Sequence, residues 1–165
     1  KTNNNRKTRV VIFTTNSSKN RWNEIYHLIK EIENVDVKLV NKPRGVLKPL
    51  HLQENDNIKF TSSELINWGD IIVSHASSTL IEAVIKDKKI LFLEYLSLSG
   101  EDLIVNDYNF FEKIHSDNHL VSLIKNFKFE KENNFFNKHD FLSKVLGKNY
   151  DHNKYLDNLI DKLYN

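Results

Sequence analysis

The sequence of 165 residues has no cysteine and no methionine, and only four glycines and two prolines. Without cysteine there is no disulfide framework, thiolate metal site or thiol nucleophile. The longest apolar runs, such as Ile71–Val73 and Ile90–Leu93, fall far below the roughly 20 residues of a membrane-spanning helix. An intact translation product begins with methionine, so we expect this chain to be cut from a longer protein.

Several enzyme motifs are also missing. The absence of GxGxxG and GxxxxGK[ST] argues against a dinucleotide site and a P-loop ATPase, and there is no HExxH. Without GxSxG, Ser77 and Ser78 are poor candidates for a hydrolase nucleophile. The histidines are scattered; His115 and His119 lie four residues apart, but a helix start is predicted between them. We therefore expect no metal and no cofactor.

The charge is nearly balanced, with 24 Lys and Arg against 22 Asp and Glu, a formal net charge of +2. A nucleic-acid-binding domain carries a lopsided basic surface, so we expect no nucleic-acid partner. The length suits one ordinary domain. We predict a flexible N-terminal segment over residues 1–8 and a single α/β domain over residues 9–165.

Short apolar, β-branched runs alternate with amphipathic segments. Strands are predicted at 9–15, 35–40, 70–74 and 89–93. Helices are predicted at 22–32, 62–68, 77–85, 117–127, 140–146 and 154–164, with Asp117 and Asp140 as N-caps. Residues 95–107 are expected to form a loop, and Phe110 and Phe111 to anchor the tail. The pattern predicts an α/β, doubly wound fold: a mostly parallel sheet with helices on both faces and a helical C-terminal tail.

Ligands of open parallel sheets bind beyond the carboxyl ends of the strands, so the turns after the predicted strands are the candidate sites. Thr15 and Asn16 follow the first strand, and Glu94 follows the last. Lys42 and Arg44 follow the second, where they can hold a phosphate or an anionic acceptor. The alternative for this basic pair is an exposed turn.

The turn after residues 70–74 reads His-Ala-Ser-Ser-Thr and leads into a helix. Helix N-termini attract anions, and Ser77, Ser78 and Thr79 can add hydroxyl donors to a phosphate. Glu82 can accept hydrogen bonds from ribose hydroxyls, and His75 can donate to a phosphate or act in acid–base chemistry. The alternatives are that Thr79 and Glu82 form a capping box and that His75 packs under the loop.

The segment from Trp68 to Leu93, WGDIIVSHASSTLIEAVIKDKKILFL, resembles the donor-binding half of GT-B glycosyltransferases. It is most similar to bacterial enzymes of surface and capsular polysaccharide assembly and to CDP-glycerol glycerophosphotransferases. Their pattern has an aspartate opening a strand, a Ser/Thr-rich turn, a helix with Glu-Ala and a Gly-Lys-Pro turn. In this chain the sequence Lys-Asp-Lys-Lys at residues 86–89 stands in place of Gly-Lys-Pro. Those families also have a histidine in the basic turn after the second strand, and here Arg44 stands near its place.

The resemblance implies a Rossmann-like half of a GT-B fold that binds a nucleotide-sugar or nucleotide-alditol donor. The donor phosphates would contact Ser77, Ser78 and Thr79. The donor's ribose or sugar would contact Glu82. A phosphate or the acceptor would face Lys42 and Arg44. An N-terminal domain of the same protein would complete the enzyme, so this chain alone would be inactive, and no catalytic residue is assigned. We expect a cytoplasmic enzyme, peripheral at the inner face of the membrane.

Two other functions stay open. A UDP-sugar 2-epimerase-like domain shares the fold but shows a richer acidic and glycine set around the serine turn. A non-catalytic α/β interaction module is favoured by the missing Gly-Lys-Pro turn. Nucleotide binding discriminates the interaction module from the enzymes.

Overall fold

The chain divides into two compact units, residues 1–131 and 132–165, each described by itself. The computed structural model describes residues 6–14, 19–41, 48–49, 60–75, 78–96, 108–128 and 135–146. In the first unit the elements are β1 (Thr8–Phe13), α1 (Lys19–Lys30), β2 (Val35–Asn41), β3 (Lys48–Pro49), α2 (Ser62–Trp68), β4 (Ile71–Ser74), α3 (Thr79–Ile85), β5 (Lys89–Leu93), the 3-10 helix η1 (Glu94–Leu96), β6 (Phe111–Ile114) and α5 (Asp117–Lys125). In the second unit the described element is α6 (Phe135–Leu146).

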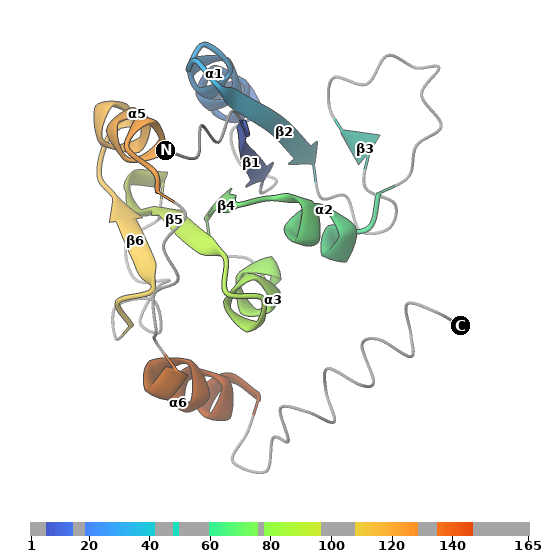
Figure 1. The fold of residues 1–165 in the computed structure, drawn as a ribbon, viewed down its shortest axis with the longest axis vertical. Helices are drawn as coiled ribbons and strands as arrows, with labels where there is room; N and C mark the ends of the chain where they lie inside the picture. The colour runs from blue at the N-terminus through green and yellow to red at the C-terminus, as the bar shows by residue number, and fades with distance from the viewer. Residues whose placement is uncertain are drawn as a thin grey trace. The chain divides into compact units, whose positions relative to one another are not determined.

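The first unit is built on a six-stranded sheet with the order β3-β2-β1-β4-β5-β6. Five strands are parallel, and the short β3 pairs antiparallel with β2. Figure 1 shows β1 and β4 in the middle of the sheet. From β1 the chain adds β2 on one side and later β4 on the other, so the direction of winding reverses between β1 and β4. The predicted α/β, doubly wound, Rossmann-like fold is confirmed.

The central strands form because their side chains are apolar on both faces. Residues 10–13 of β1 are buried, as are all four residues of β4 and residues 90–93 of β5. Continuous apolar runs of this kind are typical of parallel strands that are covered on both sides. Burial of these apolar runs stabilises the centre of the sheet.

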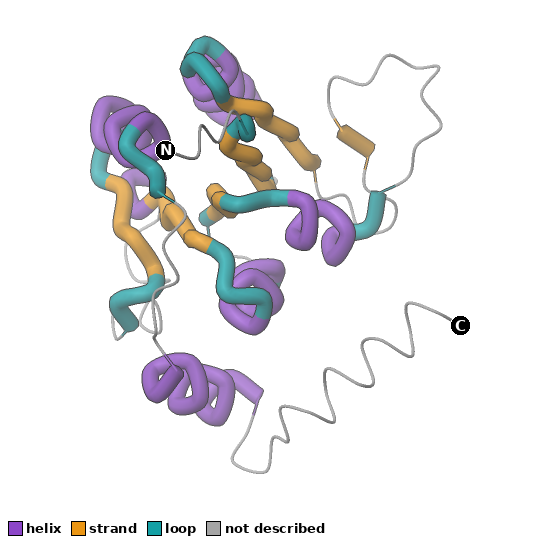
Figure 2. Tube along the Cα trace, in the orientation of Figure 1, coloured by secondary structure: helices purple, strands orange, loops and turns teal. Residues whose placement is uncertain are grey.

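Helices lie on both faces of the sheet (Figures 1 and 2). On one face, α1 and α5 pack through side chains such as Trp22, Ile25 and Leu120 against alternate residues of the strands. Their apolar positions recur at helical spacing, which gives each helix a buried stripe. On the other face, α2 and α3 cover the remaining side chains of β1, β4 and β5, among them Val11 and Phe92.

The junction between α2 and β4 is tight. Thr61 caps α2 in a capping box with Glu64, whose backbone N–H donates to Thr61 Oγ1 at 3.2 Å. Gly69 ends the helix, and a Cβ there would lie 2.8 Å from Val11 Cγ2 and 3.2 Å from Ile72 Cδ1. A glycine is needed here because the neighbouring side chains leave no room for a Cβ. The backbone conformation is not the reason, since a φ of −72° suits any residue.

Several predictions are corrected by the structure. The strand β6 was not predicted; Phe111 is its first residue and is buried. The N-cap of α5 is Ser116, because its hydroxyl accepts from the His119 backbone, and Asp117 is the first helical residue. Asp140 lies inside α6, which begins five residues earlier, at Phe135.

Both ends of the chain bear on other predictions. The predicted flexible segment 1–8 overlaps β1, whose first residue is Thr8, and Arg6 already donates to Asp70. In the tail, α6 supports a helical segment, while the predicted helix 154–164 lies outside the described residues. That residues 9–165 form one domain stays a prediction.

Candidate functional site

The strands β1 and β4 end side by side where the direction of winding reverses. Phe13 pairs with Ser74. The Ser74 hydroxyl lies within hydrogen-bonding distance of two carbonyl oxygens, those of Phe13 (3.2 Å) and His75 (2.9 Å). The segments that follow both strands therefore start from adjacent points of the carboxyl edge, where doubly wound sheets bind ligands. Two of the predicted turns follow these two strand ends in the sequence.

The structure describes four of the predicted binding residues, His75, Ser78, Thr79 and Glu82. The others lie outside the described residues, and they are Thr15, Asn16, Lys42, Arg44 and Ser77.

The turn after β4 carries its histidine inward. His75 is 7% exposed, and its ring stacks at 5.7 Å on the ring of Phe92. This burial fits packing beneath the turn. Thr79 is also buried, whereas Ser78 is exposed at the start of α3. Ser78 is thus the described hydroxyl residue of this turn that faces solvent.

The capping-box alternative for Thr79 and Glu82 is wrong. The N-cap of α3 is Ser78, in the right-handed helical region, and its side chain makes no capping hydrogen bond. Thr79 is therefore a helical residue and cannot cap. The box exists one helix earlier, at Thr61 and Glu64.

Glu82 is turned toward α2. Its Oε1 atom is buried without a hydrogen bond and lies 3.1 Å from Lys86 Nζ, an ion pair one turn along α3. Lys86 Nζ also donates to Ser63 Oγ of α2 at 2.8 Å. The Glu82 side chain is 16% exposed, so a ribose would have to compete with Lys86 for this carboxylate. Its role toward a donor stays a prediction.

The Lys-Asp-Lys-Lys turn has structural partners. Asp87 adopts a φ of 51°, a left-handed conformation that favours glycine. Lys88 Nζ donates to the carbonyl oxygens of Asn67 (3.1 Å) and Gly69 (2.7 Å), and burial lowers its pKa. This turn is therefore held by a left-handed residue, Asp87, and by hydrogen bonds from the Lys88 side chain to the end of α2.

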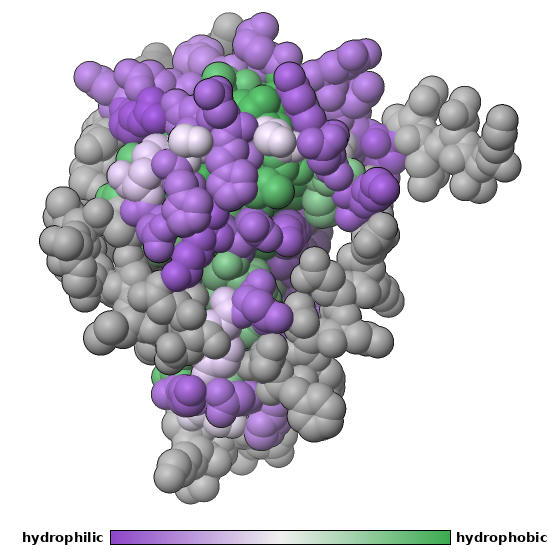
Figure 3. Space-filling model, turned by 90° about the vertical axis from the view of Figure 1, so that its left-hand side faces the viewer, coloured by the Kyte–Doolittle hydropathy of each residue, from purple (hydrophilic) through white to green (hydrophobic). Residues whose placement is uncertain are grey.

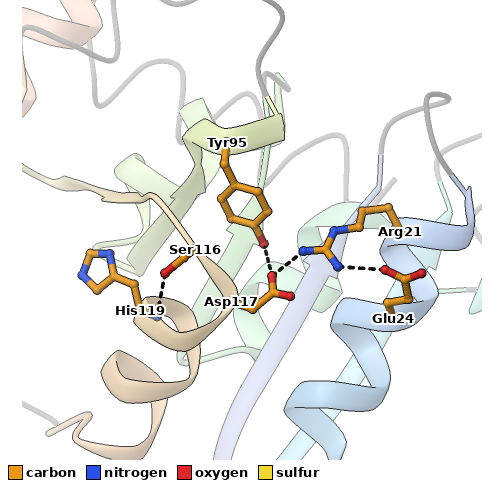
Figure 4. Close-up of polar contacts among 6 residues, drawn as sticks. All are labelled: Arg21, Glu24, Tyr95, Ser116, Asp117 and His119. Atoms are coloured by element: carbon orange, nitrogen blue, oxygen red, sulfur yellow. Dashed lines mark hydrogen bonds and ion pairs between the residues drawn. The ribbon is translucent and has the colours of Figure 1, made fainter.

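A polar network, missed by the sequence analysis, joins three further segments of the carboxyl edge (Figure 4). Asp117 Oδ1 accepts from Arg21 at 2.6 Å and from the Tyr95 hydroxyl at 2.7 Å. Arg21 also donates to Glu24 at 2.8 Å, and its guanidinium lies 5.6 Å from the Tyr95 ring centroid. The network ties α1, η1 and α5 together.

The network shifts the pKa values of Asp117, Tyr95 and Arg21. Burial acts to raise the pKa of Asp117, but hydrogen bonds from Arg21 and Tyr95 together outweigh it, so the pKa lies below its usual value. Burial, and then the bond to Asp117, raise the pKa of Tyr95. The bond to Asp117 is also the main cause of a raised pKa for Arg21. All three groups therefore hold one protonation state at neutral pH.

A second pair lies beside this network. His115 Nδ1 is 2.7 Å from Glu94 Oε2, and Lys113 Nζ is 3.6 Å from Glu94 Oε1. The His119 ring lies parallel to the His115 ring, with centroids 5.8 Å apart and planes at 13°. The face that carries α5 and β6 is mostly hydrophilic, with a smaller hydrophobic area among its polar side chains (Figure 3). The sequence analysis named Glu94 and both histidines but had no reason to join them.

The fold and this polar edge define a Rossmann-like α/β domain with its candidate site at the carboxyl ends of the parallel strands. Comparisons with protein-family models, curated proteins and solved structures found no match to this chain. Within the described residues, no helix is long and apolar enough to cross a membrane. No group of three or more potential metal-ligating side chains was found there either.

Proposed function

We propose that this chain is the donor-binding domain of a glycosyltransferase-like enzyme of surface polysaccharide biosynthesis. The donor is a nucleotide-activated sugar or alditol, and the reaction displaces its nucleoside phosphate with an acceptor hydroxyl. The observation that supports the proposal best is the adjacency of β1 and β4 at the reversal of winding, since the two predicted donor-binding turns follow these strands in the sequence.

The same proposal includes an N-terminal domain that brings the acceptor, and a cytoplasmic location at the inner face of the membrane. The donor would approach the edge near Ser78, with its charge partly balanced by donors of the turn. Because Lys86 holds Glu82, donor binding would open this ion pair and give the carboxylate to the ribose or sugar.

Thermal unfolding with UDP-glucose, CDP-glycerol and GDP-mannose as probes tests the proposal. A donor at about 100 times its dissociation constant adds roughly 2.7 kcal/mol, which raises Tm by about 5–10 °C for a domain of this size. Glu82→Ala should abolish the shift. Lys86→Ala is the matched control because it removes the same ion pair but keeps the carboxylate, and it should retain the shift.

The other outcomes separate the alternatives. A shift with UDP donors alone, together with inversion at the sugar C2 seen by NMR, would identify an epimerase-like domain. If no donor shifts Tm, the transferase proposal fails and the interaction module is favoured. Equal loss in both variants would assign Glu82 a structural role alone.

A further inference from the structure

Glu94 and His115 occupy equivalent positions at the ends of neighbouring strands. Leu93 pairs with Ile114 as the last pair of β5 and β6, and Glu94 and His115 are the next residue of each chain segment. Parallel register thus places both side chains at the carboxyl edge, where their Oε2 and Nδ1 atoms lie 2.7 Å apart. This distance puts the Nδ1 proton between the two atoms.

A carboxylate on Nδ1 determines what the other ring nitrogen can do. When Nδ1–H donates to Glu94, the neutral ring carries its lone pair on Nε2, which is directed away from the carboxylate. The His115 side chain is 63% exposed, so Nε2 is accessible. In this arrangement the Nε2 lone pair faces away from Glu94 and is available as a hydrogen-bond acceptor.

A second side-chain contact joins the two segments that carry Glu94 and His115. Tyr95 follows Glu94 in η1, and Asp117 lies two residues after His115, and these two are joined by the 2.7 Å hydrogen bond. Arg21 fastens Asp117 to α1. The two segments are therefore joined twice, once by Glu94 with His115 and once by Tyr95 with Asp117.

The remaining neighbours fix the carboxylate and the ring. Lys113 attracts Glu94 Oε1, which leaves Oε2 for His115. The parallel His119 ring limits tilting of the His115 ring, and the His119 backbone is fixed by the Ser116 cap. Lys113, through Glu94, and the His119 ring thus favour one orientation of the His115 ring.

We propose that His115, oriented by Glu94, is a proton-accepting site for a hydroxyl-bearing ligand at the carboxyl edge. In this step the ligand O–H bond breaks, the proton bonds to Nε2, and the electron pair of the broken bond stays on the ligand oxygen. Glu94 is a positioning residue. The inference goes beyond nucleotide binding and holds whichever donor the domain takes.

The tautomer of His115 tests the arrangement without a ligand. In the 15N-labelled chain at pH 8.5, long-range 1H–15N NMR correlations should show His115 mainly in the Nδ1–H form, whereas free histidine prefers Nε2–H. Glu94→Ala should move the tautomer ratio about twofold to fivefold toward Nε2–H, the range for an exposed pair. Glu112→Ala is the matched control: this glutamate on β6 is equally exposed and pairs with Lys89. It should leave the ratio unchanged.

Reactivity tests the accessible nitrogen. Diethyl pyrocarbonate at pH 8 should modify His115 faster than His27, an exposed histidine of α1 without a carboxylate partner among the described residues. Glu94→Ala should slow the reaction by about twofold to fivefold. A wild-type His115 in the Nε2–H form, a reactivity equal to that of His27, or no effect of Glu94→Ala would overturn the inference. These results are independent of the donor-binding test.

Discussion

At the amino edge of the sheet, Asp70 and Lys88 bond to backbone atoms, whereas at the carboxyl edge two groups of side chains, Glu94 with His115 and Asp117 with Arg21 and Tyr95, bond to one another. Asp70 accepts from the Arg9 backbone N–H at 2.9 Å, and Lys88 donates to two carbonyl oxygens. At the opposite edge, Glu94 contacts His115, and Asp117 binds both Arg21 and Tyr95.

The difference separates two uses of polar residues. Backbone groups at the ends of strands and helices must find a partner when they are buried, so the amino-edge contacts complete the fold. Side-chain pairs at the carboxyl edge can exchange one partner for a ligand while the backbone keeps its bonds. Substitutions at the amino edge should therefore change mainly the free energy of unfolding. Substitutions at the carboxyl edge should change mainly ligand binding and side-chain reactivity.

The largest effect is expected at the amino edge from Gly69→Ala. The added Cβ would meet Val11 Cγ2 at 2.8 Å and force the core to shift. Such overpacking should lower the free energy of unfolding by about 2–3 kcal/mol in urea denaturation. Asn67→Ala, an exposed change in the same helix, should be nearly neutral. Equal stability of the two variants would mean that the junction is loose.

Asp70→Ala should have the next largest effect. The change leaves the Arg9 backbone N–H without this acceptor and removes the ion pair to Arg6. We expect a loss of about 1–2 kcal/mol by chemical denaturation. Asp36→Ala, at the exposed position that pairs with Arg9 across β1 and β2, serves as the control and should change stability by under about 0.5 kcal/mol.

Asp117→Asn should lower stability less, and only above a certain pH. Because folding lowers the pKa of Asp117, its carboxylate stabilises the protein above the unfolded value of about 3.9. The side chain is 34% exposed, so solvent screening limits the contribution to roughly 1 kcal/mol or less. As pH falls below about 4 toward the folded pKa, wild type and variant should converge.

The measurement is urea denaturation between pH 3 and pH 7. Asp140→Asn, which removes an exposed ion pair with Lys144 in α6, is the comparison and should show a difference of only a few tenths of a kcal/mol. A constant difference between Asp117→Asn and wild type across this range would show that the Asp117 charge contributes nothing.

The smallest effect is expected for Asp87→Gly, in the turn before β5. Asp87 has a φ of 51°, so Asp87→Gly should leave stability within about 0.5 kcal/mol, since relief of strain offsets the greater freedom of the unfolded chain. Asp87→Ala should cost about 1 kcal/mol, because alanine is strained in this conformation. Thermal unfolding of the two variants side by side compares them. A stable alanine variant would show that this backbone conformation carries no strain.

The sequence predicted the elements whose burial is nearly complete. The strands β1, β4 and β5 are continuous apolar runs, and α1 shows a regular apolar stripe, so burial alone identifies them. The strand β6 was not predicted because it is an edge strand of four residues in which Glu112 and Lys113 separate the two buried positions. The order Phe-Glu-Lys-Ile does not alternate apolar and polar residues with the period of a half-buried strand, so no local signal identified it.

The candidate site was predictable only in part. The turn after β4 followed from its hydroxyl residues and from the rule for parallel sheets. The partnership of Glu94 with His115 depends on the register of β5 and β6, and that of Arg21 with Asp117 on the packing of α1 beside α5. Register and helix packing are long-range properties, and no local spacing encodes them.

The central position of β1 also has a consequence for how the chain folds. Thr8 pairs with Val35, so β1 and β2 are close in the sequence and can associate early. Val10 pairs with Ile71 of β4, which lies much later in the sequence, so this pairing forms more slowly. Until β4 arrives, one side of an apolar strand has no partner, and such an edge can pair with another copy of the chain. Docking of β4 therefore covers an apolar edge of β1 that could otherwise pair with another chain during folding.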